Sequence, residues 1–328
     1  MTTESPEPIR AVSSLRTTVV RIIGTFAPLF GLILLICFLA STTDTFFTLR
    51  NLLNVMDQVT VIGIMAVGMT FVILIGGIDL SVGSVLAWSL MSMGYCYQYW
   101  GLPFPVAIAL AIASSALFGV FSGVLITMAK LPPFIATLAT MSIARGMAGL
   151  ITDGRQIVGF PDWFNDLAII RHFGMLSVTV GIMLVLFIIS AVYLKYRARG
   201  RDLYAIGGNP EVARLSGIRV NLVTIGVYTL CAALAGLAGV ILAARLDAAQ
   251  PSAGLAYELD TIAAVIIGGA SLSGGVGGIG GTAIGVLIIG FLNNGLNLLR
   301  VSPFVQQVII GAVIALAVVI DTWRRRIR

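Results

Sequence analysis

Residues 58–77 read QVTVIGIMAVGMTFVILIGG and carry no charged side chain. About 20 apolar residues in a helix are enough to cross the hydrocarbon core of a bilayer. Because lipid offers the backbone no hydrogen-bond partners, such a segment must form a helix or a strand of a closed barrel. The run lacks the alternation of polar and apolar residues typical of barrel strands. It therefore predicts a transmembrane helix that ends near Gly76 and Gly77.

The whole chain has the same apolar character. Of its 328 residues 58% are hydrophobic and 10% are charged, and its mean hydropathy is +1.03. Water-soluble proteins carry roughly a quarter charged residues. We therefore expect an all-α polytopic membrane protein.

The apolar runs predict ten spans, with the eighth short for a full crossing. The second span ends at two glycines, so one or both of these spans are expected to be broken or partly re-entrant. The ten spans form one transmembrane domain, residues 26–321, between an N-terminal tail (1–25) and a basic C-terminal tail (322–328). The spans lie near residues 26–41, 58–76, 83–99, 105–128, 133–151, 174–194, 222–244, 259–272, 281–299 and 304–321.

The N-terminal tail admits two interpretations. Its basic residues followed by an apolar run could be a cleaved signal peptide, but the polar part is long and many apolar segments follow, which favours an uncleaved first anchor. With this tail in the cytoplasm, most lysines and arginines fall on the cytoplasmic side, as the positive-inside rule requires. The sequence thus predicts a multi-pass protein of the bacterial inner membrane with both termini cytoplasmic.

The longest inner connection, residues 195–221, is basic and contains an amphipathic segment, Glu211–Ile218. A short helix in such a loop could dock in a groove on a partner subunit. The alternative is a solvated loop whose charge only satisfies the positive-inside rule. We favour a partner-binding element.

Several function classes lack the residues they need. A phosphate-binding P-loop requires Gly-Lys-Ser/Thr, and the two lysines, Lys130 and Lys195, stand in other contexts. The single histidine, His172, has no neighbouring Ser or Cys in a nucleophile motif. We expect no catalytic residues, no metal site, no cofactor and no nucleic-acid partner. The cysteines lie in apolar runs and are read as small hydrophobic residues: Cys37, Cys96 and Cys231.

An internal echo links two glycine-rich segments. Residues 75–83 read IGGIDLSVG, and residues 267–275 read IGGASLSGG. Transporters often contain repeats whose interrupted helices line the substrate path. Chance similarity is the alternative, since Gly, Leu and Ser are common in this chain.

A set of motifs in a fixed order resembles the permease subunits of bacterial ABC importers for monosaccharides, over about residues 46–321. Residues 155–173, the run Tyr95–Trp100 and Arg300 depart from the ribose-type pattern. These differences leave ribose, arabinose, xylose and galactose open as substrates. The matching segments are FFTLRNL (46–52), IMAVGMT (64–70), GGIDLSVGS (76–84), FIATL (134–138), AIGGN (205–209), ARLSGI (213–218), YELDTIAAV (257–265) and GFLNNGLNLL (290–299).

The resemblance implies that a periplasmic binding protein delivers the sugar and a separate ATP-binding cassette ATPase hydrolyses ATP. Because ABC motors work as ATPase pairs, two permease chains are expected, as a homodimer. The resemblance also places the coupling loop to the ATPase between residues 195 and 221. Its candidate residues are Arg201, Gly207, Gly208, Asn209, Glu211, Arg214 and Gly217.

Polar residues within apolar spans are the candidates for the sugar path. An ionised carboxylate in lipid is costly unless it is paired or faces water, so Asp79 is expected in the bundle interior, with Arg145 as a conceivable partner. Amides in helices can instead hold helices together. A purely structural role therefore stays open for the whole candidate set: Asp79, Ser81, Arg145, Asn293, Asn294, Asn297 and Gln306.

Two other function classes fit the sequence less well. A secondary transporter or channel could also have ten helices, but ion coupling usually shows several buried carboxylates or histidines, and here Asp79 alone qualifies. A membrane enzyme would need a reactive cluster, and none is recognisable in the sequence. The ABC permease is the prediction that remains.

Overall fold

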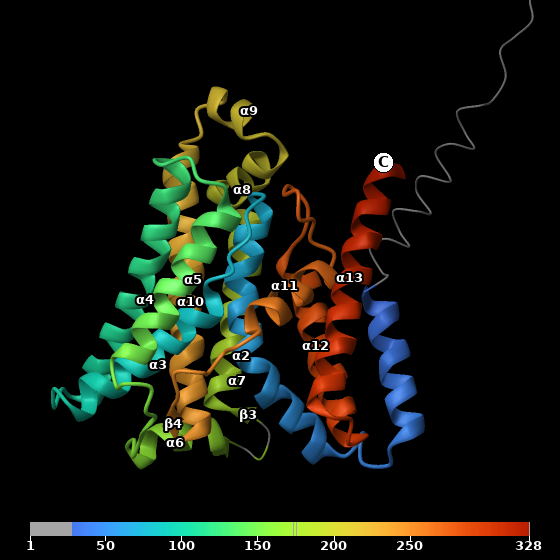
Figure 1. The fold of residues 1–328 in the computed structure, drawn as a ribbon. Helices are drawn as coiled ribbons and strands as arrows, with labels where there is room; N and C mark the ends of the chain where they lie inside the picture. The colour runs from blue at the N-terminus through green and yellow to red at the C-terminus, as the bar shows by residue number, and fades with distance from the viewer. Residues whose placement is uncertain (1–27, 173, 175, 328) are drawn as a thin grey trace, which may run out of the picture.

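The computed structural model describes residues 28–172, 174 and 176–327. These residues form an almost entirely helical bundle (Figure 1). Its helices are Pro28–Thr42, α2 (Leu49–Leu74), α3 (Val82–Gln98), α4 (Phe104–Thr127), α5 (Pro133–Leu150), α6 (Asp162–Ile169), α7 (Val178–Tyr196), α8 (Ala198–Gly208), α9 (Pro210–Leu215), α10 (Val220–Leu246), α11 (Tyr257–Ile267), α12 (Ile279–Leu298) and α13 (Pro303–Ile327).

Within the described residues, four two-residue strands occur in the connections. Strand β1 (Ile157–Val158) pairs antiparallel with β4 (Ala248–Ala249), and β2 (Arg171–His172) pairs with β3 (Leu176–Ser177). The β2–β3 pair lies within the connection before α7, and the β1–β4 pair joins that connection to the segment after α10. Helix α6 and strand β4 lie at one end of the bundle, and α8 and α9 lie at the other (Figure 1).

Every predicted span overlaps a helix over the described residues. Within that part of the chain, five helices are long and apolar enough to cross a membrane by themselves: α2, α4, α7, α10 and α12. Helix α11 has 11 residues, about 16 Å at 1.5 Å per residue, which is too short to cross a hydrocarbon core of roughly 30 Å. The predicted N-terminal tail, residues 1–25, lies outside the described residues.

Two helix ends differ most from the prediction. Helix α2 begins at Leu49 rather than near residue 58, with Thr48 as its N-cap. Hydropathy missed its first turns because they carry Asn51, Asn54 and Asp57, whose side chains bind other segments. Helix α13 continues to Ile327, so the chain remains helical through most of the predicted C-terminal tail.

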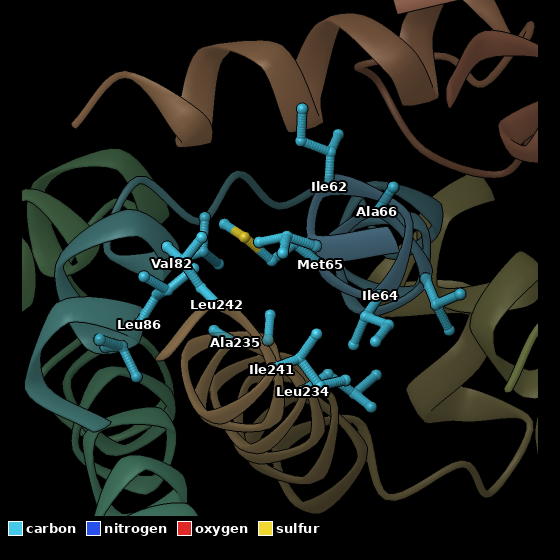
Figure 2. Close-up of a cluster of buried hydrophobic side chains, with 14 of the residues drawn as sticks. Ile62, Ile64, Met65, Ala66, Val82, Leu86, Leu234, Ala235, Ile241 and Leu242 are labelled. Carbon is cyan, nitrogen blue, oxygen red and sulfur yellow. The ribbon is translucent and has the colours of Figure 1, made fainter. Parts of the chain in front are cut away.

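Helix α2 forms the centre of the bundle and packs against α7, α10, α11 and α12, with a smaller contact to α8. Its long buried face meets α3 and α10 in the apolar cluster of Figure 2, where Met65 lies among Val82, Leu86 and Leu242. Glycines bring the helices close together. An added Cβ on Gly68 would lie 2.9 Å from the Cα of Cys231, and one on Gly123 would lie 2.7 Å from the Cα of Ile225. These are the close helix contacts expected of small residues in membrane bundles.

Candidate functional site

The two segments of the sequence echo lie against each other in the structure. Helix α2 ends at Leu74, and the chain continues without helix to Ser81. A second break separates α11 from α12. The backbone N–H of Gly275 donates to the carbonyl of Leu74 at 2.9 Å, and a Cβ on Gly76 would lie 3.3 Å from the Ser273 carbonyl oxygen. The echo therefore marks two helix breaks in direct contact.

Helix α8 packs onto both breaks through Gly207. A side chain at this position would clash with the Leu74 carbonyl and the Gly275 nitrogen, and a Cβ on Gly274 would lie 2.8 Å from the Cα of Gly207. Gly76, Gly274 and Gly275 have φ values of 78°, 84° and 72°, the left-handed region that favours glycine. We call these four residues the glycine joint: Gly76, Gly207, Gly274 and Gly275.

Tyr204 fixes α8 to the second break from the side. Its hydroxyl donates to the carbonyl of Gly277 at 3.1 Å. Burial raises the pKa of the Tyr204 phenol, so the hydroxyl keeps its proton and remains a donor near neutral pH. The connection 195–221 is thus attached to the helix breaks by backbone packing and by a side-chain hydrogen bond.

Asp79 lies within the first break and is completely buried. Its Oδ1 accepts hydrogen bonds from the Ser81 N–H at 2.9 Å and the Ser81 hydroxyl at 2.6 Å. Its Oδ2 has no hydrogen-bond partner at ordinary geometry among the described residues, although the Cys231 thiol interacts with the carboxyl. The expectation that Asp79 avoids lipid is confirmed.

Arg145 does not pair with Asp79. Its Nη1 donates to the carbonyls of Pro251 and Ala253, each at 2.7 Å, and its charge interacts with the carboxylate of Glu258. The segment before α11 supplies these acceptors, whereas Asp79 satisfies one oxygen with the residue two positions along its own chain. Glu258 was not among the predicted site residues, because it lies just before the predicted span 259–272.

Three of the predicted amides hold helices together. Asn294 of α12 exchanges two hydrogen bonds with Asn51 of α2, at 3.0 and 2.9 Å. Asn297 accepts from Gln306 at 2.9 Å, which ties the end of α12 to the start of α13. Asn293 lies beside them and is half-buried. These contacts are the interhelical role that was the alternative to a sugar path.

The predicted path residues consequently fall in different places. Asn51, the partner of Asn294, lies near the start of α2, whereas Asp79 follows its end. Asp79 interacts with the Cys231 thiol, and Cys231 packs against Gly68 of α2, which lies about 26 Å along the helix from Asn51 at 1.5 Å per residue. Among the described residues, the members of the predicted set therefore make separate contacts in different parts of the bundle.

A polar cluster near the start of α2 was not predicted. Arg171 donates to Asp57 at 2.8 Å and to Asn54 at 2.7 Å, and the Ser177 hydroxyl donates to the other oxygen of Asp57 at 2.9 Å. The cluster borders a pocket of about 240 Å³ that Arg245 also lines. The predicted span began at residue 58, so Asp57 lay just outside it. The only sequence signal for this cluster was the charged residues of the connection that contains Arg171.

The connection 195–221 folds into α8 and α9 at one end of the bundle, where α9 protrudes (Figure 1). Asn209 caps α9 by accepting from the N–H groups of Glu211 and Val212 at 3.0 and 3.1 Å. Val212 and Leu215 point outward, with 57% and 88% of their surface exposed. The remaining predicted coupling residues occupy exposed positions on the same two helices and the following turn: Arg201, Gly208, Arg214 and Gly217.

The turn after α9 has a backbone conformation that favours glycine. Gly217 has φ 88°, and its N–H donates to the carbonyl of Arg214 at 3.0 Å. Arg214 also forms an exposed ion pair with Glu211 at 2.9 Å. The protruding element therefore has a defined local structure although α9 itself has few neighbours.

Residues 51–318 match the family model described as branched-chain amino acid transport system / permease component. The chain is 46% identical to the ribose import permease protein RbsC of Escherichia coli K12, over 89% of this chain and 92% of that protein. It is 47% identical to RbsC of Bacillus subtilis, over 90% and 91%. It is 34% identical to the xylose transport system permease protein XylH of Haemophilus influenzae, over 88% and 93%.

No solved structure matches the chain significantly. The sequence similarities nevertheless extend over nearly the full length of both partners in each comparison, and they include the segments that form the glycine joint and α9. The chain therefore belongs to the branched-chain amino acid transport system permease family and, within it, to the monosaccharide importer permeases.

Proposed function

We propose that this chain is the membrane-spanning subunit of an ABC importer that carries ribose across the bacterial inner membrane. The observation that carries the proposal is the similarity to ribose import permeases at 46–47% identity over about nine-tenths of the chain. Xylose and fructose permeases match at 34%. Ribose is therefore the first substrate to test.

In this proposal the end of the bundle with α8 and α9 faces the cytoplasm and binds a separate ATPase subunit. The outward side chains of Val212 and Leu215 supply an apolar face for docking in a groove. Movement of α8 would reach both helix breaks through Gly207, because its Cα has no room to shift without displacing them. The glycine joint would thus couple ATP hydrolysis to the transport path.

The opposite end, with the pocket beside Asp57, Arg171 and Arg245, would face the periplasmic binding protein. Charged and amide groups suit a polar, hydrated docking surface or sugar entrance. Two copies of this chain would complete the transporter, since each supplies one α9 and ABC ATPases act in pairs.

The proposal is tested by reconstituting the permease in proteoliposomes with the ATPase and binding protein of its source organism. Uptake of labelled ribose should require ATP on the ATPase side and binding protein on the other side, and it should be competed poorly by xylose or fructose. Uptake driven by an ion gradient without the ATPase would show a secondary transporter instead. ATP-dependent uptake in which another sugar outcompetes ribose would overturn the ribose assignment alone.

A further inference from the structure

Helices α7 and α10 both pack on α2 and border a groove of about 790 Å³. Phe71 of α2 lies in the groove, Leu186 and Ile189 line it from α7, and Leu222 and Leu230 line it from α10. The volume lies within the range of about 300–1,000 Å³ that is usual for small-molecule sites. Nearly all of the side chains from these three helices that line it are apolar.

The end of the groove towards α8 and α9 is polar. Arg199 of α8 and Arg219, just before α10, both line it and are exposed, and Asp202 of α8 lines it as a half-buried carboxylate. Neither arginine forms an ion pair within the described part of the chain. Two guanidinium groups against one carboxylate leave the mouth with net positive charge.

We infer that this groove is a binding site for an anionic phospholipid, with one acyl chain along α7 and α10 and the phosphate at Arg199 and Arg219. Both walls belong to helices that are apolar and long enough to cross the membrane, so the groove opens towards acyl chains rather than water. Basic residues beside a membrane span attract anionic headgroups. The combination of an apolar trough and a cationic mouth fits a lipid better than a sugar.

The bound lipid would touch the element proposed to dock the ATPase. Ser216, Gly217 and Ile218 follow α9 and line the same mouth. Occupancy would therefore restrict the turn that connects α9 to α10. The lipid site itself does not depend on the proposed sugar transport, so its test uses binding alone.

The full-length permease, purified in detergent, is titrated with palmitoyl-oleoyl phosphatidylglycerol or with phosphatidylcholine of the same chains, and bound lipid is counted by native mass spectrometry. We expect tighter binding of phosphatidylglycerol. Arg219→Gln and Arg199→Gln should each reduce that preference by about five-fold, whereas Arg197→Gln, outside the groove, should not.

Gly226→Leu tests the apolar part of the site. An added Cβ at Gly226 meets nothing within 4 Å, so a leucine there should fill the groove without distorting the helices and should lower retention of both lipids. Gly181→Leu on α7 is the matched control, because Gly181 is equally unobstructed and lies outside the groove.

A photoactivatable phosphatidylglycerol with the reactive group on its acyl chain locates the site independently of these variants. Cross-links should map to Leu222, Val223 or Leu230. Equal binding of the two lipids with no effect of Gly226→Leu would overturn the proposal. Cross-linking of these residues to a second protein chain in native membranes, with no lipid adduct, would also overturn it.

Discussion

At the residue scale, Asp79 shows how a carboxylate is held inside a bundle surrounded by lipid. Its Oδ1 accepts two hydrogen bonds from Ser81, and no lysine or arginine pairs with it in the described part of the chain. The contacts seen need an oxygen acceptor at that position rather than a negative charge. An amide should therefore replace the carboxylate and a hydrocarbon should not.

Asp79→Asn should leave the amount of folded protein and the stability close to wild type, because the amide oxygen can still accept from Ser81. Asp79→Leu should lower the free energy of unfolding by about 1–3 kcal/mol, the cost of leaving buried donors unpaired, and should reduce uptake. Thermal unfolding in detergent and uptake assays measure the two effects. Wild-type behaviour of Asp79→Leu would refute the structural role given to this carboxylate.

Arg145 belongs to a separate interaction. Arg145→Leu should destabilise the protein because the carbonyls of Pro251 and Ala253 lose their charged donor. Since Arg145 and Asp79 share no hydrogen bond, the double variant with Asp79→Leu should show additive losses within about 0.5 kcal/mol. Recovery of stability in the double variant would show that the two charges pair after all.

Gly207 and Gly208 provide a matched pair of adjacent glycines. A Cβ at Gly207 would clash with backbone atoms of Leu74 and Gly275, whereas one at Gly208 meets nothing within 4 Å. Gly207→Ala should abolish transport and lower stability, because backbone cannot move aside as a side-chain end can. Gly208→Ala should retain both, as measured by uptake and thermal unfolding. Equal behaviour of the two variants would contradict the glycine joint.

At the element scale, α9 exposes apolar side chains that contribute little to packing within this chain. Six residues are too few to form a stable isolated helix, so the cap from Asn209 and the packing of α8 against the bundle hold it in place. An exposed leucine at 88% contributes little to the stability of this chain. We expect Leu215 to contribute instead to the binding of a partner subunit.

Leu215→Ser should therefore leave thermal stability unchanged and weaken binding of the ATPase subunit, measured by co-purification and by stimulated ATP hydrolysis. Leu150→Ser is the control, since Leu150 is 82% exposed at the end of α5, a few residues before the strand that pairs with β4 at the opposite end of the bundle. If both variants bind the ATPase as wild type does, α9 is not the docking element.

Helix α11 is short and packs closely on α12. It is too short to cross the membrane, and a side chain at Gly281 or Gly285 of α12 would clash with the Gly268 or Ala264 carbonyl. The close approach places the second break beside the first one. A short helix packed on a long one is thus what brings the two echo segments together.

At the scale of the whole molecule, one chain supplies one α9 and one pair of helix breaks. Native mass spectrometry of the intact complex should show two copies of this permease with two ATPase subunits. The permease purified alone should hydrolyse no ATP, because it lacks the Gly-Lys-Ser/Thr motif. A complex with a single permease chain and no homologous second one, or robust hydrolysis by the isolated chain, would contradict this assembly.

The sequence by itself determined the helical class, the positions of the long helices and the family. Lipid forces each apolar segment to satisfy its own backbone, so the information needed to identify a span is contained in that span. The start of α2 could not be located from hydropathy because the first turns of the helix are polar. Asn51 and Asp57 are stabilised there by contacts with Asn294 and Arg171. Local hydropathy cannot represent such partners.

Only the tertiary structure decided how the polar residues are used. It assigned Arg145 to carbonyls of the segment before α11 rather than to Asp79, gave Asn294 to Asn51, and brought Gly207 against both helix breaks. These contacts join segments more than 60 residues apart in sequence, and many partners are backbone groups whose chemistry is the same at every residue. Which carbonyl meets which side chain follows from helix packing, and no single segment of the sequence contains that information.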